Sequence, residues 1–410
     1  MNFNSDKATE VTPLIKVFGR CTPYDKVMVV NTFIKAGSIV MFCGDGGNDV
    51  GSLKAAHTGI ALSDAEASMV SPFTSLDKDI RACVDVLKEG RCALTSALAS
   101  YKFLLMYGQL GAVNLLAMAY LGILASEWCW VFMDGIWTIP LAFALPLAKS
   151  ANKLSATRPT ASLFSFHTLS SWFGVYLLNL AFLVGAFFYL FGQDWFQCRM
   201  WESGDISNVL VLGDNYESET LYLMTGAQLV GSAMVYNFGY EFRQAWWRNY
   251  VFAILSIGFF VFQIYIALVP GQASCFFRVN CSNEDVVRGI VVDLLPIQNP
   301  FNTTVMPESF QNGMVGIMVG NLVAITIYEY FIVNGIRQYH AAKRLAKEAA
   351  KDGWRSTERR RSSAVTMDRR RSSALEMMDH SKMMAISETL KTVEAMNSTD
   401  ATERAADESV

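Results

Sequence analysis

Six long apolar segments, nearly free of charged residues, follow one another along the chain after its first ninety residues. A helix needs about 20 such residues to cross a hydrocarbon layer about 30 Å thick. Apolar residues make up 52% of the 410-residue chain, which is too many for a purely soluble protein. The sequence therefore predicts a membrane protein with spans at Thr95–Leu121, Trp128–Ala148, Leu169–Phe191, Leu221–Tyr240, Val251–Val269 and Gly313–Ile336.

The segments between these spans alternate between basic and non-basic composition. Lys149, Lys153 and Arg158 follow the second span, and Arg243 and Arg248 follow the fourth. The other connections are longer and richer in acids and amides. Because cytoplasmic loops carry the excess of Lys and Arg, we expect both termini in the cytosol, and insertion by an internal span without a cleaved signal.

The external segment before the last span holds Cys275, Cys281 and two triplets of the glycosylation type, at Asn280 and Asn302. Its position permits a disulfide and a glycan, and coincidence explains the pattern equally well. A third triplet, at Asn397, lies on the predicted cytosolic side and should be inert. The eight cysteines show neither a CxxC pair nor metal-ligand spacing, which argues against a zinc site.

Residues 341–410 are predicted to form a disordered cytosolic tail. Within it, Arg-Arg-Arg-Ser-Ser-Ala occurs at 359–364 and again at 369–374. Arginines before serines suit basophilic kinases, and added phosphate would cancel a positive patch beside an anionic leaflet. The alternative is a solvated tail that is simply rich in arginine.

The residues ahead of the first span predict part of an α/β domain. Helical character at 26–34 is followed by a β-rich run at 38–43, a glycine-rich loop, a helix ending near His57 and a short strand at 59–62. Strand, loop, helix and strand in this order are typical of a doubly wound sheet, whose functional loops follow the strands. Residues 1–90 are too few for a whole domain of this kind, so we expect a partial one.

The loop after the first predicted strand reads Gly44-Asp45-Gly46-Gly47-Asn48-Asp49. Glycines let the backbone approach a bound phosphate, and two carboxylates four residues apart suit Mg²⁺, which prefers oxygen ligands. The pattern indicates a metal–phosphate site, with a simple acidic turn as the alternative.

With its flanks, this loop resembles the GDGxNDxxxLKxA hinge motif of P-type ATPases, whose phosphorylation domain has a haloacid dehalogenase-like fold. Thr22-Pro23-Tyr24-Asp25-Lys26 is similar to the second phosphate-site element of that family. The resemblance implies Mg²⁺ as cofactor, ATP as substrate, and Asp45 and Asp49 as metal ligands. Asn48 and Asp49 would order the phosphate site, and Lys26 would stabilise the charge that develops during phosphoryl transfer. A solvated helix lysine is the alternative for Lys26.

Residues 55–68, 71–75 and 89–92 are similar to the B branch of the type-five P-type ATPases, the endolysosomal polyamine transporters. The resemblance covers residues 17–340 in order and hydropathy, and it implies an ATP-driven cation transporter in an endolysosomal or vacuolar membrane. The phosphorylated-aspartate motif DKTGT, the TGE loop and a nucleotide-binding domain are not in these residues. We therefore expect a C-terminal portion that works with a missing N-terminal part. The net charge of −3 gives no indication of nucleic acid as a partner.

Asp134 is the clearest ionisable residue within a predicted span, where a charge costs about 2.5–3.5 kcal/mol on insertion scales. Glu127 precedes it by seven residues, which places both carboxylates on one face of a regular helix. With Trp130 and Trp137 nearby, this face suits a long organic cation. The alternatives are that Asp134 pairs with Lys102 or a backbone group, and that Glu127 simply lies at the membrane interface.

In the resembled transporters, the preceding helix offers the polyamine a tyrosine and, four residues later, an amide. Tyr107 matches the tyrosine, whereas Gly111 occupies the amide position and Gln109 lies on another face. The predicted substrate-binding residues are therefore Tyr107, Glu127 and Asp134, with a cation, expected to be a polyamine, as cargo. Glu329 in the last span is interpreted as structural.

Three other functions fit part of the pattern. A truncated chain could be a catalytically silent membrane scaffold. A membrane-anchored phosphatase could use the same fold, although no nucleophilic DxD-type aspartate precedes the glycine-rich loop. The A branch of the type-five ATPases, which extracts mislocalised helices, is the third.

Overall fold

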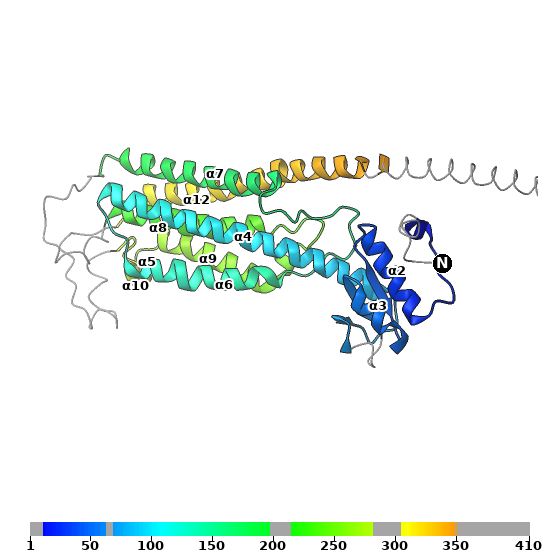
Figure 1. Ribbon diagram of the computed structural model, residues 1–410. Helices are drawn as coiled ribbons and strands as arrows, with labels where there is room; N and C mark the ends of the chain where they lie inside the picture. Colours follow the sequence, from blue (N-terminus) through cyan, green and yellow to red (C-terminus); the bar gives the residue numbers. More distant parts are fainter. Residues whose placement is uncertain (1–10, 63–68, 197–214, 282–304, 348, 351–410) are drawn as a thin grey trace, which may run out of the picture. The chain divides into compact units, whose positions relative to one another are not determined.

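The computed structural model describes residues 11–62, 69–196, 215–281, 305–347 and 349–350 (Figure 1). The chain forms two units, Met1–Arg337 and Gln338–Val410. In the second unit the described residues are helical, and the Lys343 ammonium lies 5.9 Å from the centre of the Tyr339 ring. The repeated Arg-Ser segments of the tail and the triplet at Asn397 lie outside the described residues.

A small parallel sheet with two helices forms the N-terminal part of the first unit. The sheet has the order β1-β2-β3, and its register pairs Phe42 with Gly59 and Ile60 with Phe73. The predicted order of strand, loop, helix and strand is confirmed. The elements are α2 (Pro23–Lys35), β1 (Met41–Gly44), α3 (Val50–Ala55), β2 (Thr58–Ala61) and β3 (Phe73–Thr74).

Helix α2 begins where the sequence places a strong start signal. The Thr22 side chain accepts a hydrogen bond from the Asp25 backbone amide, and the Asp25 carboxylate accepts one from the Thr22 amide at 3.0 Å. Pro23 occupies the first turn, where its missing N–H would have had no helical partner. This capping box fixes the first turn, which carries Lys26.

The rest of the first unit is a helical bundle. It consists of α4 (Arg81–Leu121), α5 (Glu127–Val131), a π-helix (Phe132–Thr138), α6 (Ile139–Ala144), α7 (Phe166–Phe191), α8 (Tyr216–Tyr236), α9 (Tyr250–Leu268), the short α10 (Gln272–Phe276), α12 (Glu308–Ile327) and a second π-helix (Tyr328–Val333).

Five helical stretches in the described part of the chain are long and apolar enough to cross a membrane, and they match five of the six predicted spans. The first begins earlier than predicted, because α4 continues without a break from Arg81. The stretches are Arg81–Leu121, Glu127–Leu147, Phe166–Phe191, Tyr250–Leu268 and Glu308–Lys347.

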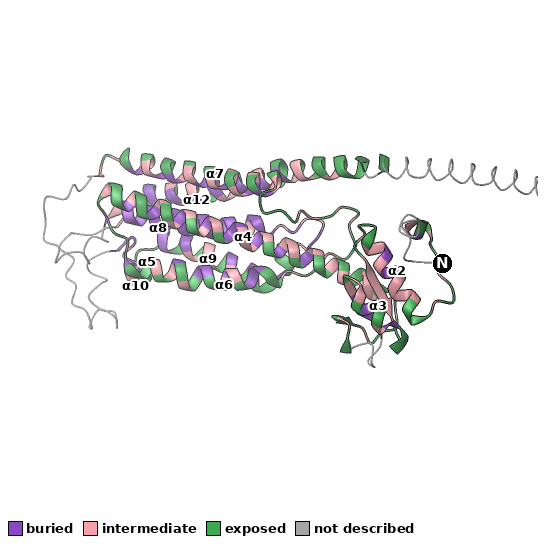
Figure 2. Ribbon diagram, viewed as in Figure 1, coloured by how far each residue is buried: buried purple, intermediate pink, exposed green. Residues whose placement is uncertain are grey.

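Helix α8, at the place of the other predicted span, lies among α4, α7, α9 and α12 and is buried along nearly all of its length (Figure 2). Two of its polar side chains bond to α7: Gln228 donates to the Asn179 carbonyl at 2.8 Å, and the Ser232 hydroxyl accepts from the Asn179 amide at 3.0 Å. Because its neighbours satisfy these groups, α8 needs less apolar surface than a helix that faces lipid. The count of six spans stays a prediction.

Cys275 and Cys281 form a disulfide, which settles the pairing that the sequence left open. The glycan permitted at Asn280 is contradicted in the folded chain, because the Asn280 side chain is fully buried. Its carbonyl oxygen accepts hydrogen bonds from the Met306 amide at 3.0 Å and from Gln311 at 3.1 Å. The triplet at Asn302 lies outside the described residues.

Glu241, in the basic loop between α8 and α9, contacts the basic loop that follows the second span and the end of the last span. Its carboxylate accepts hydrogen bonds from Ser155 and Thr157, each at 2.7 Å, and pairs with Arg337 at 3.2 Å. Burial raises the pKa of Glu241, but the hydroxyl donors and Arg337 outweigh it, so the pKa is lowered overall.

A lowered folded-state pKa means that Glu241 stabilises the fold above its unfolded pKa, and that this stability is lost as the pH falls through the folded value. We expect Glu241→Gln to make the unfolding free energy depend less on pH at acidic pH. The slope of the profile at neutral and basic pH should change much less. Thermal unfolding from about pH 3 to pH 7, a range that brackets the usual Glu pKa, measures this. Parallel profiles for the two proteins over this range would contradict the prediction.

Candidate functional site

The N-terminal half of the predicted site is built around an ion pair between Lys26 and Asp49. The Lys26 ammonium, from the first turn of α2, lies 2.7 Å from Asp49 Oδ1. Asp49 ends the short 3₁₀-helix Gly47–Asp49 that leads from β1 into α3, and it is buried. Two residues that the sequence places in separate motifs thus meet at the carboxyl end of β1.

Glycines in this region are required by close packing. A Cβ added at Gly44 would lie 2.6 Å from both Asp49 Cβ and Asp49 Oδ2. At Gly51 it would lie 2.9 Å from the Val27 side chain of α2. The absence of side chains at these two positions lets the Asp49 carboxylate fold back over β1 and lets α3 approach α2.

Asp45 and Asn48, the other predicted catalytic residues, are exposed at the same loop. Within the described ranges no group of three or more His, Cys, Asp or Glu side chains is positioned to hold a metal ion. Asp45 and Asp49 provide two carboxylates, a set that fits Mg²⁺ when substrate phosphate and water supply the remaining ligands. The residues therefore fit a metal shared with a phosphate and do not form a complete protein cage.

Cys43, the residue before the glycine-rich loop, interacts with Cys83 at the start of α4, which the sequence analysis missed. Burial first, and then the hydrogen bond with Cys83, raise the pKa of the Cys43 thiol to about 11. A raised pKa favours the protonated thiol at neutral pH, which lowers the reactivity of Cys43 as a nucleophile.

The membrane half of the predicted site is joined by a hydrogen bond from the Tyr107 hydroxyl of α4 to Asp134 Oδ1, at 2.9 Å. Asp134 lies in the π-helix Phe132–Thr138, a type of local distortion that is frequent at functional sites. Both side chains were predicted to bind substrate, and the fold brings them into contact across two helices. At the amide position, Gly111 faces open space.

Trp137 differs from the prediction, whereas the substrate-binding role of Glu127 stays a prediction. Glu127 is the exposed first residue of α5, and among the described residues it makes no hydrogen bond or ion pair with Tyr107 or Asp134. Trp137 is buried, with its ring centre 5.8 Å from that of Tyr222 in α8. The π-helix replaces the regular helix on which the prediction of one shared face was based, so Trp137 packs in the core.

Lys102 pairs with Glu329, which contradicts the alternative that it pairs with Asp134. The two charged atoms are 3.4 Å apart, and both side chains are buried. Ser171 of α7 accepts a hydrogen bond from Lys102 at 2.7 Å and bonds to both Glu329 oxygens, at 2.9 and 2.8 Å. The Lys102 ammonium also lies 4.5 Å from the centre of the Tyr236 ring. The interpretation of Glu329 as structural agrees with this cluster.

The ion pair between Lys102 and Glu329 was not predicted, although the sequence contains a signal for it. Each residue is a charge of opposite sign within a predicted span, and such charges in membranes tend to pair. The two residues are 227 positions apart, so no local pattern indicates their contact.

A small parallel sheet carrying a glycine-rich acidic loop, together with apolar helices that enclose charged residues, is the combination expected of an ion-motive ATPase. Comparison with known proteins confirms the resemblance: the chain is homologous to polyamine- and cation-transporting ATPases. No protein-family model matches the chain.

Polyamine-transporting ATPase 13A3 of Macaca fascicularis is 31% identical over 275 residues, and its Homo sapiens counterpart is 30% identical over 275 residues; each match covers 62% of this chain and 22% of the relative. The probable cation-transporting ATPase 13A5 of Homo sapiens is 30% identical over 271 residues, 61% of this chain and 22% of the relative. The chain thus spans about a fifth of the length of the curated relatives it matches.

Proposed function

We propose that this chain is part of an ATP-driven transporter of the type-five B branch, which moves polyamines through an aspartyl-phosphate cycle. The observation that carries the proposal is the contact between Tyr107 and Asp134. It presents an anionic carboxylate from a π-helix next to an aromatic hydroxyl on the facing helix. A cationic amine suits such a pair through charge attraction and hydrogen bonding.

In this proposal residues 1–90 are the C-terminal half of a haloacid dehalogenase-like phosphorylation domain. Lys26 would neutralise a phosphoryl oxygen, while Asp49 holds the lysine in place through their ion pair. Asp45 and Asp49 would hold Mg²⁺, which when bound offsets the charge of the transferring phosphoryl group. Asn48, exposed on the same loop, would donate a hydrogen bond from its amide to the phosphate. The acceptor aspartate and the nucleotide-binding domain would come from the missing N-terminal part.

The proposal places residues 91–340 in an endolysosomal or vacuolar membrane with both termini in the cytosol. The basic loops support this orientation, since Lys149, Lys153 and Arg243 lie between spans on one side. The names of the relatives support cation and polyamine transport by those proteins. The polar rim of the substrate path would include Glu127. This residue is exposed at the start of the span that also carries Asp134, at the end of the span away from Lys149.

Asp134→Asn in the complete transporter tests the proposal. The substitution keeps the shape and the hydrogen bond to Tyr107 but removes the charge, so stimulation of ATP hydrolysis by spermine is expected to fall by a factor of ten or more. Asp194→Asn, which changes a carboxylate outside the five spans, is the matched control and should leave stimulation unchanged. Undiminished stimulation in Asp134→Asn would contradict the assigned site.

A further inference from the structure

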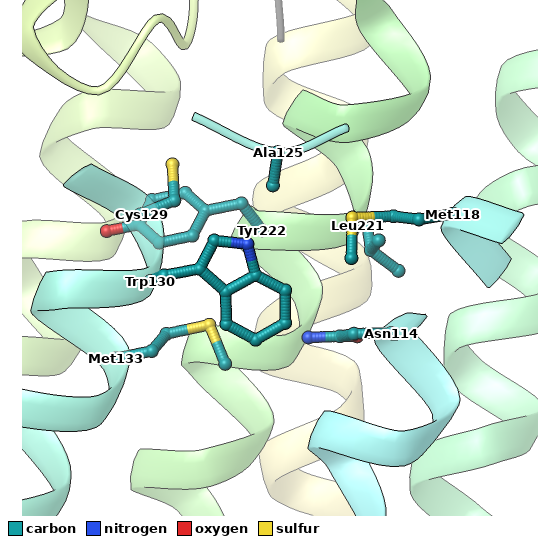
Figure 3. A pocket seen from close by; sticks show the side chains of 8 residues that line it. All are labelled: Asn114, Met118, Ala125, Cys129, Trp130, Met133, Leu221 and Tyr222. Carbon is teal, nitrogen blue, oxygen red and sulfur yellow. The ribbon is translucent and has the colours of Figure 1, made fainter. Parts of the chain in front are cut away.

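The free cysteines in the described part of the chain fall into two groups. The thiols of Cys21, Cys92 and Cys129 donate hydrogen bonds to backbone carbonyl oxygens. Of these, Cys129 is among the side chains that line a small cavity of the bundle (Figure 3). Cys43 and Cys83 are different, because their two thiols are hydrogen-bonded to each other. The proposed function uses neither of these two thiols.

The fold brings this pair together from elements that are far apart in the chain. Cys43 is the third residue of β1, and Cys83 lies in the first turn of α4, which follows β2 and β3 in sequence. On one face of the sheet, Phe42 packs against Leu53 and Ala61. Because successive side chains of a strand point to opposite faces, Cys43 leaves β1 on the other face, where it meets Cys83. Both cysteines are half-buried, so a small solute can reach them.

The two cysteines belong to elements that carry different halves of the predicted site. Cys43 precedes Asp45 by two residues, on the strand that leads into the glycine-rich loop. Cys83 begins the helix that continues without a break to Leu121 and carries Tyr107. A bond between the two sulfur atoms would therefore join the strand of the phosphate site directly to the helix of the substrate site.

We propose that Cys43 and Cys83 form a redox-sensitive site, at which a peroxide converts the two thiols into a disulfide that slows ATP hydrolysis until a cellular thiol reduces it. The effect on hydrolysis rests on the proposed function, whereas the disulfide itself does not. The predicted topology places this pair in the cytosol, where disulfides in most organisms are transient and serve catalysis or redox sensing.

The oxidation balances in two steps. The Cys83 sulfur attacks one oxygen of hydrogen peroxide and becomes a sulfenic acid, while the other oxygen leaves with the thiol proton as water. The Cys43 sulfur then attacks the Cys83 sulfur, and the sulfenic hydroxyl leaves with the Cys43 proton as a second water. Cys83 is assigned the first step because the positive end of the α4 dipole favours the negative charge of an attacking sulfur. Contact between the two residues makes the second step intramolecular, which favours it over further oxidation.

A disulfide at this position would disturb the predicted phosphate site. Two sulfur atoms in contact must approach to about 2.05 Å to form a bond, so β1 and the start of α4 must move toward each other. Gly44, the next residue of β1, is already packed so closely on Asp49 that an added Cβ would lie 2.6 Å from its side chain. Asp49 in turn holds the Lys26 ammonium at 2.7 Å. Because a displacement of about 1 Å can lower a catalytic rate about 100-fold, a large loss of activity is expected.

The test treats the complete transporter with hydrogen peroxide and then blocks the remaining thiols with N-ethylmaleimide. Trypsin cuts after Lys and Arg, so it releases Cys43 in the peptide 36–54 and Cys83 in the peptide 82–88. Mass spectrometry without reduction is expected to find these two peptides linked. The maximal rate of ATP hydrolysis is expected to fall about tenfold or more as the link forms, and to return after dithiothreitol is added.

Two variants make the result specific. Cys83→Ser cannot form the disulfide and should keep its rate in peroxide. Cys21→Ser, at another half-buried cysteine of the N-terminal part, is the matched control and should lose activity as the parent does. Equal losses in Cys83→Ser and the parent would overturn the proposal.

The linked peptide is measured on the parent protein, so this readout does not depend on the folding of a variant. Loss of the free Cys83 thiol without the linked peptide overturns the proposal, and so does a linked peptide that leaves the rate unchanged. If the reduced parent does not hydrolyse ATP, the proposed function fails, and the linked peptide then decides by itself whether the disulfide forms.

Discussion

Replacing Lys102 with methionine is expected to destabilise the bundle by about 3–5 kcal/mol, because it leaves the Glu329 carboxylate buried without its cation. Glu329 is 1% exposed and retains only the Ser171 hydroxyl as a side-chain partner in the described part of the chain. Lys102 joins α4 to the π-helix that follows α12, so its loss should loosen contacts between distant spans. Thermal unfolding in detergent, followed by far-ultraviolet circular dichroism, measures the change.

Two further variants make this prediction specific. Lys102→Met combined with Glu329→Gln removes both charges and should recover much of the lost stability, because no unpaired charge remains buried. Lys88→Met breaks a shorter ion pair with Asp85, at 2.6 Å, but Asp85 is 61% exposed, so the effect should stay within about 1 kcal/mol. Equal losses for Lys102→Met and Lys88→Met would show that the buried pair has no special role.

Lys26→Met in the complete transporter is expected to lower the maximal rate of ATP hydrolysis about 100- to 1000-fold, the usual effect of removing a donor that stabilises transition-state charge. The reason is the position of the Lys26 ammonium, which lies 2.7 Å from Asp49 at the carboxyl end of β1. Steady-state hydrolysis at saturating ATP, on protein whose folding has been checked by thermal unfolding, measures the rate.

Lys35→Met, an exposed lysine in the last turn of the same helix, is the matched control and should hydrolyse ATP at the parent rate. Lys26→Arg keeps the charge and should retain more activity than Lys26→Met. If Lys26 were only a solvated helix lysine, Lys26→Met would behave as Lys35→Met does, and its catalytic role would be ruled out.

Much of the fold follows from local pattern. The strand, loop, helix and strand order was predictable because Gly37 ends a helical run and Gly44 ends a β-rich run, and the two runs differ in the spacing of their apolar residues. Five spans were predictable because apolar length alone signals them. Helix α8 shows the limit of hydropathy, since a helix enclosed by other helices carries polar residues such as Gln228 that bond to its neighbours.

The candidate site was only partly predictable. Tyr107 and Asp134 were chosen separately, and their hydrogen bond depends on how two spans pack, which no local pattern encodes. The π-helix at Asp134 was not predictable, because the sequence argument assumed 3.6 residues per turn throughout, and Trp137 packs in the core instead of beside Asp134. The alternative in which Asp134 pairs with Lys102 was wrong, because sequence order does not show which charges meet.

We propose that this chain holds one half of a phosphorylation site, whose acceptor aspartate lies elsewhere in the complete transporter. The most direct measurement is to label the complete protein with radioactive ATP, confirm that hydroxylamine releases the label, and identify the labelled peptide by mass spectrometry. We predict an aspartyl-phosphate in a peptide outside these 410 residues, and no label on this chain when it is purified alone. A hydroxylamine-sensitive phosphate on a peptide within this chain would contradict it.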